Sequence, residues 1–393
     1  MGPLSGIVVV DLSRALAGPY CSMMLADAGA EVIKIELPGT GDESRGWGPP
    51  FIGGESSYFL SINRSKKSVT LNLKSEAGRE VLRRLLTGAD VLLENFTPGT
   101  IERLGFAYEA VHEINPRLVF CSISGFGRDG PGRDLPAYDL IVQGMSGWMS
   151  LTGEVGGPPL RPGVPNADIN AGMFAAFAIA LGLLRREHTG QGCFVETNML
   201  HAMVAQLTYQ AGLFFATGVA PEPVGHLHPS IAPYGTLRTA DGYVNISAGN
   251  DLHFQRFCAA LGLAELSDNP EYAVNRRRAA DRDRIVAIIE RRLAQLSTQE
   301  TVRLLRAAGV PCGPVYDLRQ VFDDPQALHL RLRRTVPHPT AGNVDLVTTP
   351  IKVAGEEVPM VAPPTLGQHT EEVLSRLGYT PEEVAMLRRE GVV

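Results

Sequence analysis

Asp168 stands at the start of the most apolar segment of the chain, residues 168–186. That segment predicts a helix, because basic side chains gather near its end and Gly190 follows just beyond, as is usual at helix C-termini. An Asp at a helix start has two interpretations. It can cap the first turn, or it can act as a nucleophile whose ionised form is favoured by the helix dipole. Spacing alone leaves both open.

A second group of reactive side chains is basic. The chain has only five lysines, and four of them, Lys34, Lys66, Lys67 and Lys74, lie within 41 residues together with Arg64. Such a cluster on an acidic protein suggests an anionic ligand with several phosphates. The alternative is an ordinary solvated face.

Other motifs exclude several kinds of chemistry. Residues 125–130 match G-x-G-x-x-G, but Pro131 and Gly132 follow instead of an apolar helix, so we interpret them as a glycine-rich turn. No P-loop, H-E-x-x-H or G-x-S-x-G motif is present. His226 and His228 have no neighbouring Cys or acidic residue to complete a metal site. Five widely spaced cysteines are typical of reduced thiols, and we expect no bound metal.

Composition narrows the class of protein. The 393 residues carry 36 Lys and Arg against 42 Asp and Glu, a net charge of −6, which disfavours nucleic acid as a partner. We find no uninterrupted apolar run of membrane-spanning length and no basic N-terminal region of a signal peptide. These features predict a cytoplasmic protein that does not enter a membrane.

Strand and helix patterns alternate over the first 130 residues. Apolar runs at 6–11, 31–36, 90–94 and 118–124 predict buried parallel strands with helical segments between them. We therefore expect an α/β fold with a doubly wound sheet. A Gly/Pro-rich stretch at 218–224 marks a linker, and strand and helix patterns resume beyond it. The predicted domains are 1–221 with 326–393, and a smaller α+β domain at 222–325.

Short motifs along the whole chain, in order, resemble those of the class III (CaiB/BaiF-type) CoA-transferases, a family that includes formyl-CoA transferase and 2-methylacyl-CoA racemase. The resembling segments are 6–18, 30–36 (AEVIKIE), 41–46 (GDESRG), 63–69 (NRSKKSV), 94–99 (ENFTPG), 137–139 (AYD), 167–168, 190–192 (GQG), 309–314 (GVPCGP) and 366–370 (LGQHT).

The resemblance implies an interlocked homodimer, a Rossmann-like large domain built from both chain ends, and Asp168 as the catalytic carboxylate. It implies no permanent cofactor, with coenzyme A as a co-substrate beside acyl-CoA and carboxylic acid substrates. The residues that it places against coenzyme A are Ala15, Ala17, Leu71, Lys74, Asn95, Phe96, Arg103, Tyr138 and Met199.

Departures within the family bear on the substrate. Leu16 stands where formyl-CoA transferase has an active-site Gln, and residues 225–234 resemble the branch that uses succinyl-CoA-type donors and dicarboxylate acceptors. Arg45, Arg161 and His228 are candidate partners for a second carboxylate. The racemases use a His at the position of Tyr138, and a phenol is a poor base near neutral pH. Racemisation and coenzyme A binding without catalysis are the alternatives to transfer.

Overall fold

The computed structural model describes residues 2–393, which divide into two compact units. The first unit comprises Met1–Trp148, Arg161–Thr217 and Leu328–Val393, and the second comprises Met149–Leu160 and Gly218–Ala327. The segment Met149–Leu160 therefore groups with the second unit by its contacts, although the sequence places it before the linker. The domain boundaries expected from the sequence stay a prediction.

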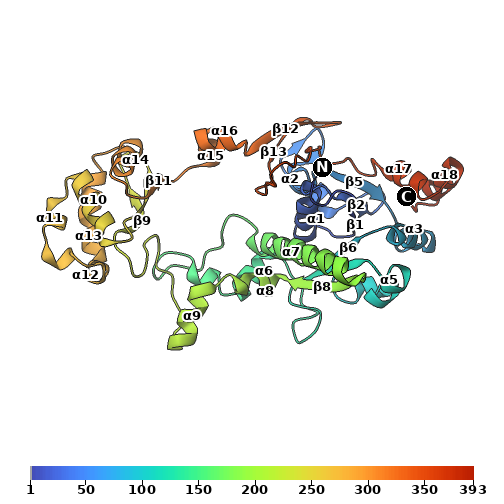
Figure 1. The fold of residues 1–393 in the computed structure, drawn as a ribbon, viewed down its shortest axis with the longest axis horizontal. Coiled ribbons are helices and arrows are strands. Elements are labelled where there is room, and N and C mark those ends of the chain that lie inside the picture. Colours follow the sequence, from blue (N-terminus) through green and yellow to red (C-terminus); the bar gives the residue numbers. More distant parts are fainter. Residues whose placement is uncertain (1) are drawn as a thin grey trace. The chain divides into compact units, whose positions relative to one another are not determined.

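A six-stranded parallel sheet forms the centre of the first unit (Figure 1). Its strands lie in the order β5 (Lys66–Thr70), β2 (Glu31–Glu36), β1 (Val8–Asp11), β6 (Val91–Glu94), β7 (Val119–Ser124) and β8 (Cys193–Asn198). In chain order this is 3-2-1-4-5-6, the strand order of doubly wound sheets. The fold is therefore α/β with a parallel sheet, and the order of the strands reverses between β1 and β6.

Alternate residues of the strands belong to two separate apolar layers, because successive side chains point to opposite faces of the sheet. One layer joins Val9 and its neighbours in the sheet to α1 (Ala17–Asp27), α7 (Asn166–Thr189) and α8 (Met199–Ala205). The other layer contains Val10 and is covered by the helices α3 (Glu76–Thr87), α5 (Tyr108–Ile114), α17 (Thr370–Arg376) and α18 (Pro381–Arg389).

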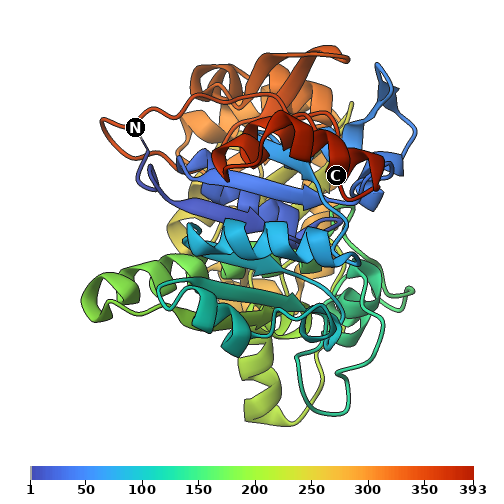
Figure 2. The same ribbon diagram turned by 90° about the vertical axis from the view of Figure 1, so that its right-hand side faces the viewer.

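The C-terminal helices belong to the sheet's covering although they come last in the chain. Figure 2 shows α17 and α18 lying beside the N-terminal strands. Thr370 Oγ1 accepts a hydrogen bond of 3.0 Å from the N–H of Thr70, across 300 residues of sequence. His369 Nδ1 likewise accepts from the N–H of Ser68 at 3.1 Å. The first unit is thus closed by segments from the two ends of the described chain.

Shorter elements complete the first unit. They are η1 (Glu43–Gly46), β3 (Phe51–Ile52), β4 (Glu55–Ser56), α2 (Ser57–Ile62), α4 (Thr100–Arg103), α6 (Asp139–Met145), α9 (Thr208–Thr217), β12 (Arg333–His338) and β13 (Gly342–Val347).

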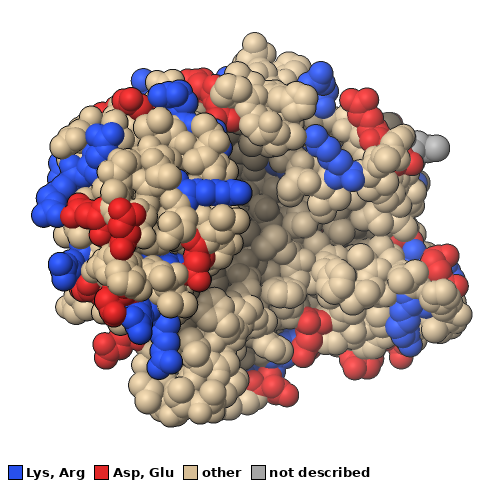
Figure 3. Space-filling view, turned by 60° about the vertical axis from the view of Figure 1, so that its left-hand side comes forward, with Lys and Arg blue, Asp and Glu red and all other residues tan. Residues whose placement is uncertain are grey.

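The second unit has its own apolar core around an antiparallel sheet of β11 (Cys312–Pro314), β10 (Tyr243–Ser247) and β9 (Tyr234–Arg238). The remaining elements after the linker are α10 (Asp251–Leu261), α11 (Ala264–Ser267), η3 (Pro270–Tyr272), α12 (Asn275–Ala280), α13 (Arg282–Leu293), α14 (Thr298–Ala307) and α15 (Leu318–Asp323), while α16 (Pro325–Leu330) spans the boundary and η2 (Met149–Leu151) precedes the linker. On the face drawn in Figure 3, positive and negative side chains are interspersed.

Helix α7 is the one helix within residues 2–393 that is long and apolar enough to cross a membrane by length and composition. In the fold α7 lies along β7 and β8 and packs against α1, so one side of it is buried in the core. Its other side exposes apolar residues, among them Phe177, Leu181 and Leu184.

Candidate active site

The carboxyl ends of β1, β2 and β6 gather three loops at one edge of the sheet, beside the point where the strand order reverses. In doubly wound sheets this crevice is where ligands bind. The turn after β1 leads from Asp11 to α1, the loop after β2 contains Asp42, and Asn95 and Phe96 follow β6. Residues that the sequence marked separately are therefore brought together here.

The turn between Asp11 and α1 is held by side chains from the other two loops. Asn95 Oδ1 accepts from the Arg14 N–H at 2.8 Å, and its Nδ2 donates to the Arg14 carbonyl at 2.9 Å. The N–H of Ala15 donates to Asp42 Oδ1 at 3.2 Å. The turn then passes into α1, which packs closely against α7.

Gly172 permits that close packing. A Cβ atom on Gly172 would lie only 2.6 Å from the carbonyl oxygen of Ala17, so any larger residue would separate the two helices. Because Gly172 is one turn beyond Asp168, the approach of the helices also sets where the Asp168 carboxylate lies. A backbone hydrogen bond joins Asp168 to Ala17.

Asp168 occupies the third position of α7 and does not cap the helix, because the helix begins at Asn166 after Pro165. The capping interpretation of Asp168 is therefore wrong. Asp139 fulfils that role instead, since its Oδ1 accepts from the N–H of Ala167 at 2.9 Å. The helix begins at Asn166, two residues before the start that the sequence predicted.

Burial raises the pKa of Asp168 from 3.8 to about 7, with a further contribution from the negative charge of Asp139, while the hydrogen bond from Ala17 opposes the rise. A carboxylate with such a pKa is only partly ionised at neutral pH and is a stronger nucleophile than an ordinary Asp. Buried groups with perturbed pKa values are concentrated at functional sites.

Two neighbours of Asp168 were not among the site residues expected from the sequence. Asp139 is adjacent to Tyr138 in the 137–139 motif, and Gln143 Nε2 donates to its Oδ2 at 2.6 Å. The pKa of Tyr58 is raised to about 12 by burial and by the charges of Asp168, Asp139 and Asp42. The position of Asp139 in a recognised motif was the available signal, whereas no sequence signal marked Tyr58.

The basic cluster forms neither one site for an anionic ligand nor an ordinary solvated face, because most of its members are paired with acidic residues. Lys34 is fully buried and pairs with Asp42 at 2.8 Å, while Lys66 is buried 3.5 Å from Asp11. Lys67 pairs with Glu31 and Glu372. Arg64 pairs with Asp27 at 2.5 Å. Acidic residues on neighbouring strands and loops thus neutralise these four side chains. Lys74 is the exposed lysine of the group.

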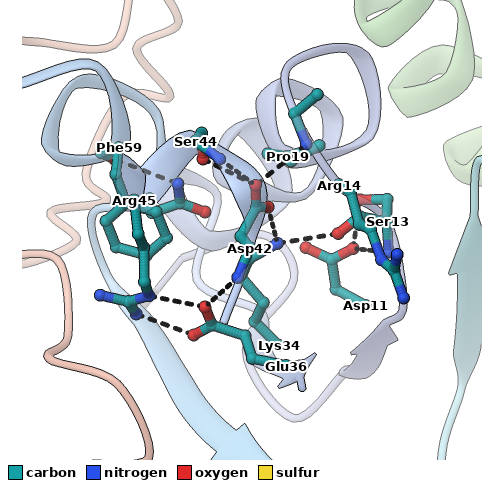
Figure 4. A network of polar contacts seen from close by, with 12 residues as sticks. Asp11, Ser13, Arg14, Pro19, Lys34, Glu36, Asp42, Ser44, Arg45 and Phe59 are labelled. Atoms are coloured by element: carbon teal, nitrogen blue, oxygen red, sulfur yellow. Dashed lines mark hydrogen bonds and ion pairs between the residues drawn. The ribbon is translucent and has the colours of Figure 1, made fainter. Parts of the chain in front are cut away.

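These buried charges form a connected network beneath the turn (Figure 4). Lys34 Nζ donates to the Ser13 carbonyl at 2.8 Å and bridges to Asp42. Glu36 accepts two hydrogen bonds from Arg45, at 2.7 and 2.8 Å, and one from the Asp42 N–H at 3.0 Å. The Lys34 ammonium holds the pKa of Asp42 down, at about 2, against the effect of burial.

Several residues expected to contact coenzyme A line one pocket of about 280 Å³ at this edge. Leu71, Lys74 and Phe96 belong to its wall, together with Arg14, whose guanidinium lies 5.2 Å from the Phe96 ring centroid. A pocket of about 410 Å³, lined by residues that include Arg14 and Asp42, opens beside the same loops. An apolar wall, an aromatic ring and two cations suit a nucleotide with phosphate groups.

The remaining expected contact residues lie in varied settings. Arg103 is exposed and donates to Thr100, a residue of the same pocket wall. Tyr138 is exposed at the start of α6, whereas Met199 is buried in the core at the start of α8. Ala15 and Ala17 belong to the turn described above.

Of the candidate substrate residues, Leu16 is buried against apolar neighbours next to the turn. Arg45 is already committed to Glu36 and lies over the Phe59 ring, 3.6 Å from its centroid. Arg161 is exposed in the first unit. His228 lies in the second unit, in the wall of a pocket of about 460 Å³.

The site can bind an anionic nucleotide and present a carboxylate of raised pKa beside a helix N-terminus. Within residues 2–393, no group of three or more His, Cys, Asp or Glu side chains is arranged to hold a metal ion. A carboxylate in this setting can act as a nucleophile, and backbone N–H groups can stabilise the charge that develops on it.

Comparisons with known proteins identify the family of the chain. Residues 4–370 match the model of CoA-transferase family III. The chain is 39% identical over its whole length to human succinyl-CoA:glutarate CoA-transferase, covering 90% of that protein, and 38% identical to a succinate–glutarate CoA-transferase of Agrobacterium fabrum, with 95% of this chain and 96% of the relative aligned.

A solved structure supports the assignment at the level of the fold. The crystal structure of a CaiB/BaiF family protein from Brucella suis aligns with a TM-score of 0.88 and 38% identity, over 96% of this chain and 99% of the other. With a family model covering nearly the full length and relatives similar from end to end, the chain belongs to CoA-transferase family III and is a CoA-transferase.

Proposed function

We propose that the chain transfers coenzyme A from succinyl-CoA or a similar acyl-CoA to a dicarboxylic acid of glutarate size, with Asp168 as the nucleophile. The observation that carries the role of Asp168 is its partly buried carboxylate at the start of α7, with a raised pKa and a hydrogen bond from Ala17. The names of the relatives support the substrate class, since the human and Agrobacterium proteins are glutarate CoA-transferases.

In the first half-reaction an oxygen of Asp168 attacks the thioester carbonyl carbon. The new C–O bond forms as the C–S bond breaks, which leaves a mixed anhydride and the coenzyme A thiolate. The thiolate then attacks the Asp168 carbonyl carbon, and the first acid leaves as a carboxylate. The products are an aspartyl thioester and the free acid, and no proton is consumed. The covalent steps conserve the energy of the thioester.

The second half-reaction repeats these steps in reverse order. A carboxylate oxygen of the acceptor attacks the aspartyl carbonyl carbon, and the thiolate leaves. The thiolate next attacks the acceptor's carbonyl carbon, which releases Asp168 as a carboxylate and forms the new acyl-CoA. Water must be excluded throughout, because both intermediates hydrolyse. The N–H of Ala17 is placed to stabilise charge on the Asp168 carboxyl group.

The pocket at the edge of the sheet supports a binding mode for coenzyme A. Phe96 and Leu71 would contact the adenine, and Lys74, with Arg103 nearby on α4, would pair with phosphate groups. Asn95 would act indirectly, through the two hydrogen bonds that it makes to Arg14. Ala15, Ala17, Tyr138 and Met199 complete the set of proposed coenzyme contacts.

For the acceptor's second carboxylate we propose Arg161, because Arg45 is neutralised by Glu36. The role of His228 stays a prediction from the sequence. Leu16 would provide an apolar wall for the methylene chain of the acid. The exposed apolar side of α7 and the exposed rings of α9, Phe215 above all, support the proposal that a second copy of the chain covers them in a homodimer. The cytoplasmic location stays a prediction.

The deciding experiment compares the wild-type enzyme with the Asp168→Asn variant, using succinyl-CoA and glutarate. The wild type should form glutaryl-CoA, and mass spectrometry of the reacting enzyme should find coenzyme A on the peptide that contains Asp168. The variant should lose both. Asp27→Asn is the matched control, because the Asp27 side chain is also largely buried, in its pair with Arg64. Normal turnover by Asp168→Asn would reject the nucleophile.

A further inference from the structure

The turn that leads into α1 holds an unfavourable backbone conformation. Ala15 has a φ of 63°, in the left-handed region that L-residues with a Cβ atom rarely occupy. The N-cap residue, Leu16, offers no side-chain hydrogen bond to the helix. The next residue, Ala17, is the one whose backbone reaches Asp168. The surroundings must therefore hold the turn in place.

Three consecutive residues of the turn are each held by a different side chain. The Ser13 carbonyl accepts from Lys34 Nζ at 2.8 Å, and both backbone groups of Arg14 bond to Asn95. The contact to the strained residue itself comes from Asp42, whose Oδ1 accepts from the Ala15 N–H at 3.2 Å. Asp42 thus holds the residue at which the chain departs from its preferred conformation.

Asp42 is itself held from several sides. Its Oδ2 lies 2.8 Å from Lys34 Nζ, and both side chains are fully buried. Its Oδ1 also accepts from the N–H and the hydroxyl of Ser44, at 2.9 and 2.7 Å. Its own N–H donates to Glu36 Oε2. A buried carboxylate with these partners is a rigid support, and Figure 4 shows it between the turn and the Glu36–Arg45 pair.

We propose that Asp42 is a positioning residue for the transfer reaction: with Lys34 it fixes the left-handed conformation of Ala15 and so directs the Ala17 N–H to Asp168. This inference rests on the proposed function of Asp168. Asp42 does not touch the reacting atoms. It acts through two links, the Ala15 hydrogen bond and the turn that follows it.

The proposal predicts that Asp42→Ala raises the pKa of Asp168, whereas the loss of a negative charge alone would not raise it. The Ala17 hydrogen bond lowers the pKa of Asp168, so its loss in Asp42→Ala raises that pKa further. Removal of the Asp42 charge without movement of the turn would lower the pKa of Asp168 or leave it unchanged. The acid limb of kcat/KM, which follows ionisation of Asp168, should therefore move up by about one pH unit in the variant.

The experiment measures kcat/KM from pH 5 to 9 for the wild type, Asp42→Ala and Asp42→Asn, in samples whose folded fraction is checked by thermal unfolding. In Asp42→Asn the amide must turn an NH₂ group toward either Lys34 or Ala15, so its limb should move up by a smaller amount. This isosteric variant carries the test if Asp42→Ala does not fold. Asp27→Ala removes a largely buried ion pair at the far end of α1 and should leave the limb unmoved.

A limb that stays in place or moves down in the folded Asp42 variants would overturn the proposal. The pKa of Asp168 is also measured without turnover, from its carboxyl ¹³C titration, assigned by difference with Asp168→Asn. If the titration moves up while Asp168→Asn remains active, the proposed nucleophile fails and the positioning role of Asp42 stands. If Asp168→Asn is inactive and the titration does not move, only the positioning role fails.

Discussion

Replacement of Asp168 by Asn should stabilise the folded protein at alkaline pH, although we expect it to abolish transfer. The pKa of Asp168 is raised from 3.8 to about 7 in the fold, so the folded state disfavours the charged form relative to the unfolded chain. An Asn of the same shape carries no charge and removes that penalty. The opposite result, a loss of stability, is what a capping Asp would give.

The size of the effect follows from the difference between the two pKa values. Each pH unit of difference corresponds to about 1.36 kcal/mol, so the penalty reaches roughly 4 kcal/mol above pH 7. Because the folded pKa lies above the unfolded one, the penalty shrinks as the pH falls from 7 to 4. It vanishes below pH 4, where Asp168 is protonated in both states. The stability gain of Asp168→Asn should follow the same course.

Urea unfolding of the wild type and Asp168→Asn at pH 4, 6 and 8 measures this gain directly. Asp42→Asn is a control of opposite sign, because Asp42 has a folded pKa of about 2. It should lose roughly 2.5 kcal/mol at pH 6 and 8, and the loss should decline only as the pH falls below 4. An Asp168→Asn variant that is less stable than the wild type at pH 8 would refute the reasoning.

Three further predictions concern geometry, binding and charge. Gly172→Ala should lower kcat by about 10- to 100-fold, because its Cβ would meet a backbone oxygen of α1 at 2.6 Å. Gly182→Ala, on the same helix against the buried Val119 side chain of β7, should cost stability and spare kcat. Equal kcat values for the two variants would contradict this. Lys74→Ala should raise KM for the acyl-CoA about fivefold with kcat unchanged in initial-rate assays, and an unaltered KM would remove it from the phosphate contacts. Asp139→Asn should move the acid limb of kcat/KM below its wild-type position, since it removes a like charge beside Asp168, and an upward shift would count against that electrostatic role.

The strands of the sheet could be predicted because their apolar runs are short, regular and bounded by turn residues. Their pairing in one parallel sheet followed from the alternation with helices. The ends of the helices were harder to predict from the sequence. Residues 276–296 have the sequence pattern of one helix, but α12 ends at Ala280 and α13 begins at Arg282. Similarly, the apolar pattern of residues 200–215 is typical of one helix, but α8 ends at Ala205 and α9 begins at Thr208, which has a φ of 42°.

The candidate site shows the same division between local and distant information. Asp168 could be identified from its place in a motif and before an apolar helix. The partners of the lysines could not, because they come from distant parts of the chain. Lys67 pairs with Glu372, 305 residues away, and Lys66 lies beside Asp11. Counting basic residues along the sequence cannot reveal which of them the fold neutralises.

The position of α17 and α18 on the sheet has a consequence for how the protein is made. The strands that these helices cover are synthesised first, and about 300 residues follow before Thr370 can bond to Thr70. At the usual speed of ribosomes that interval is roughly 15 to 60 s. During this interval the apolar face of the sheet stays exposed on the nascent chain. Chaperones that bind emerging polypeptides would bind this face.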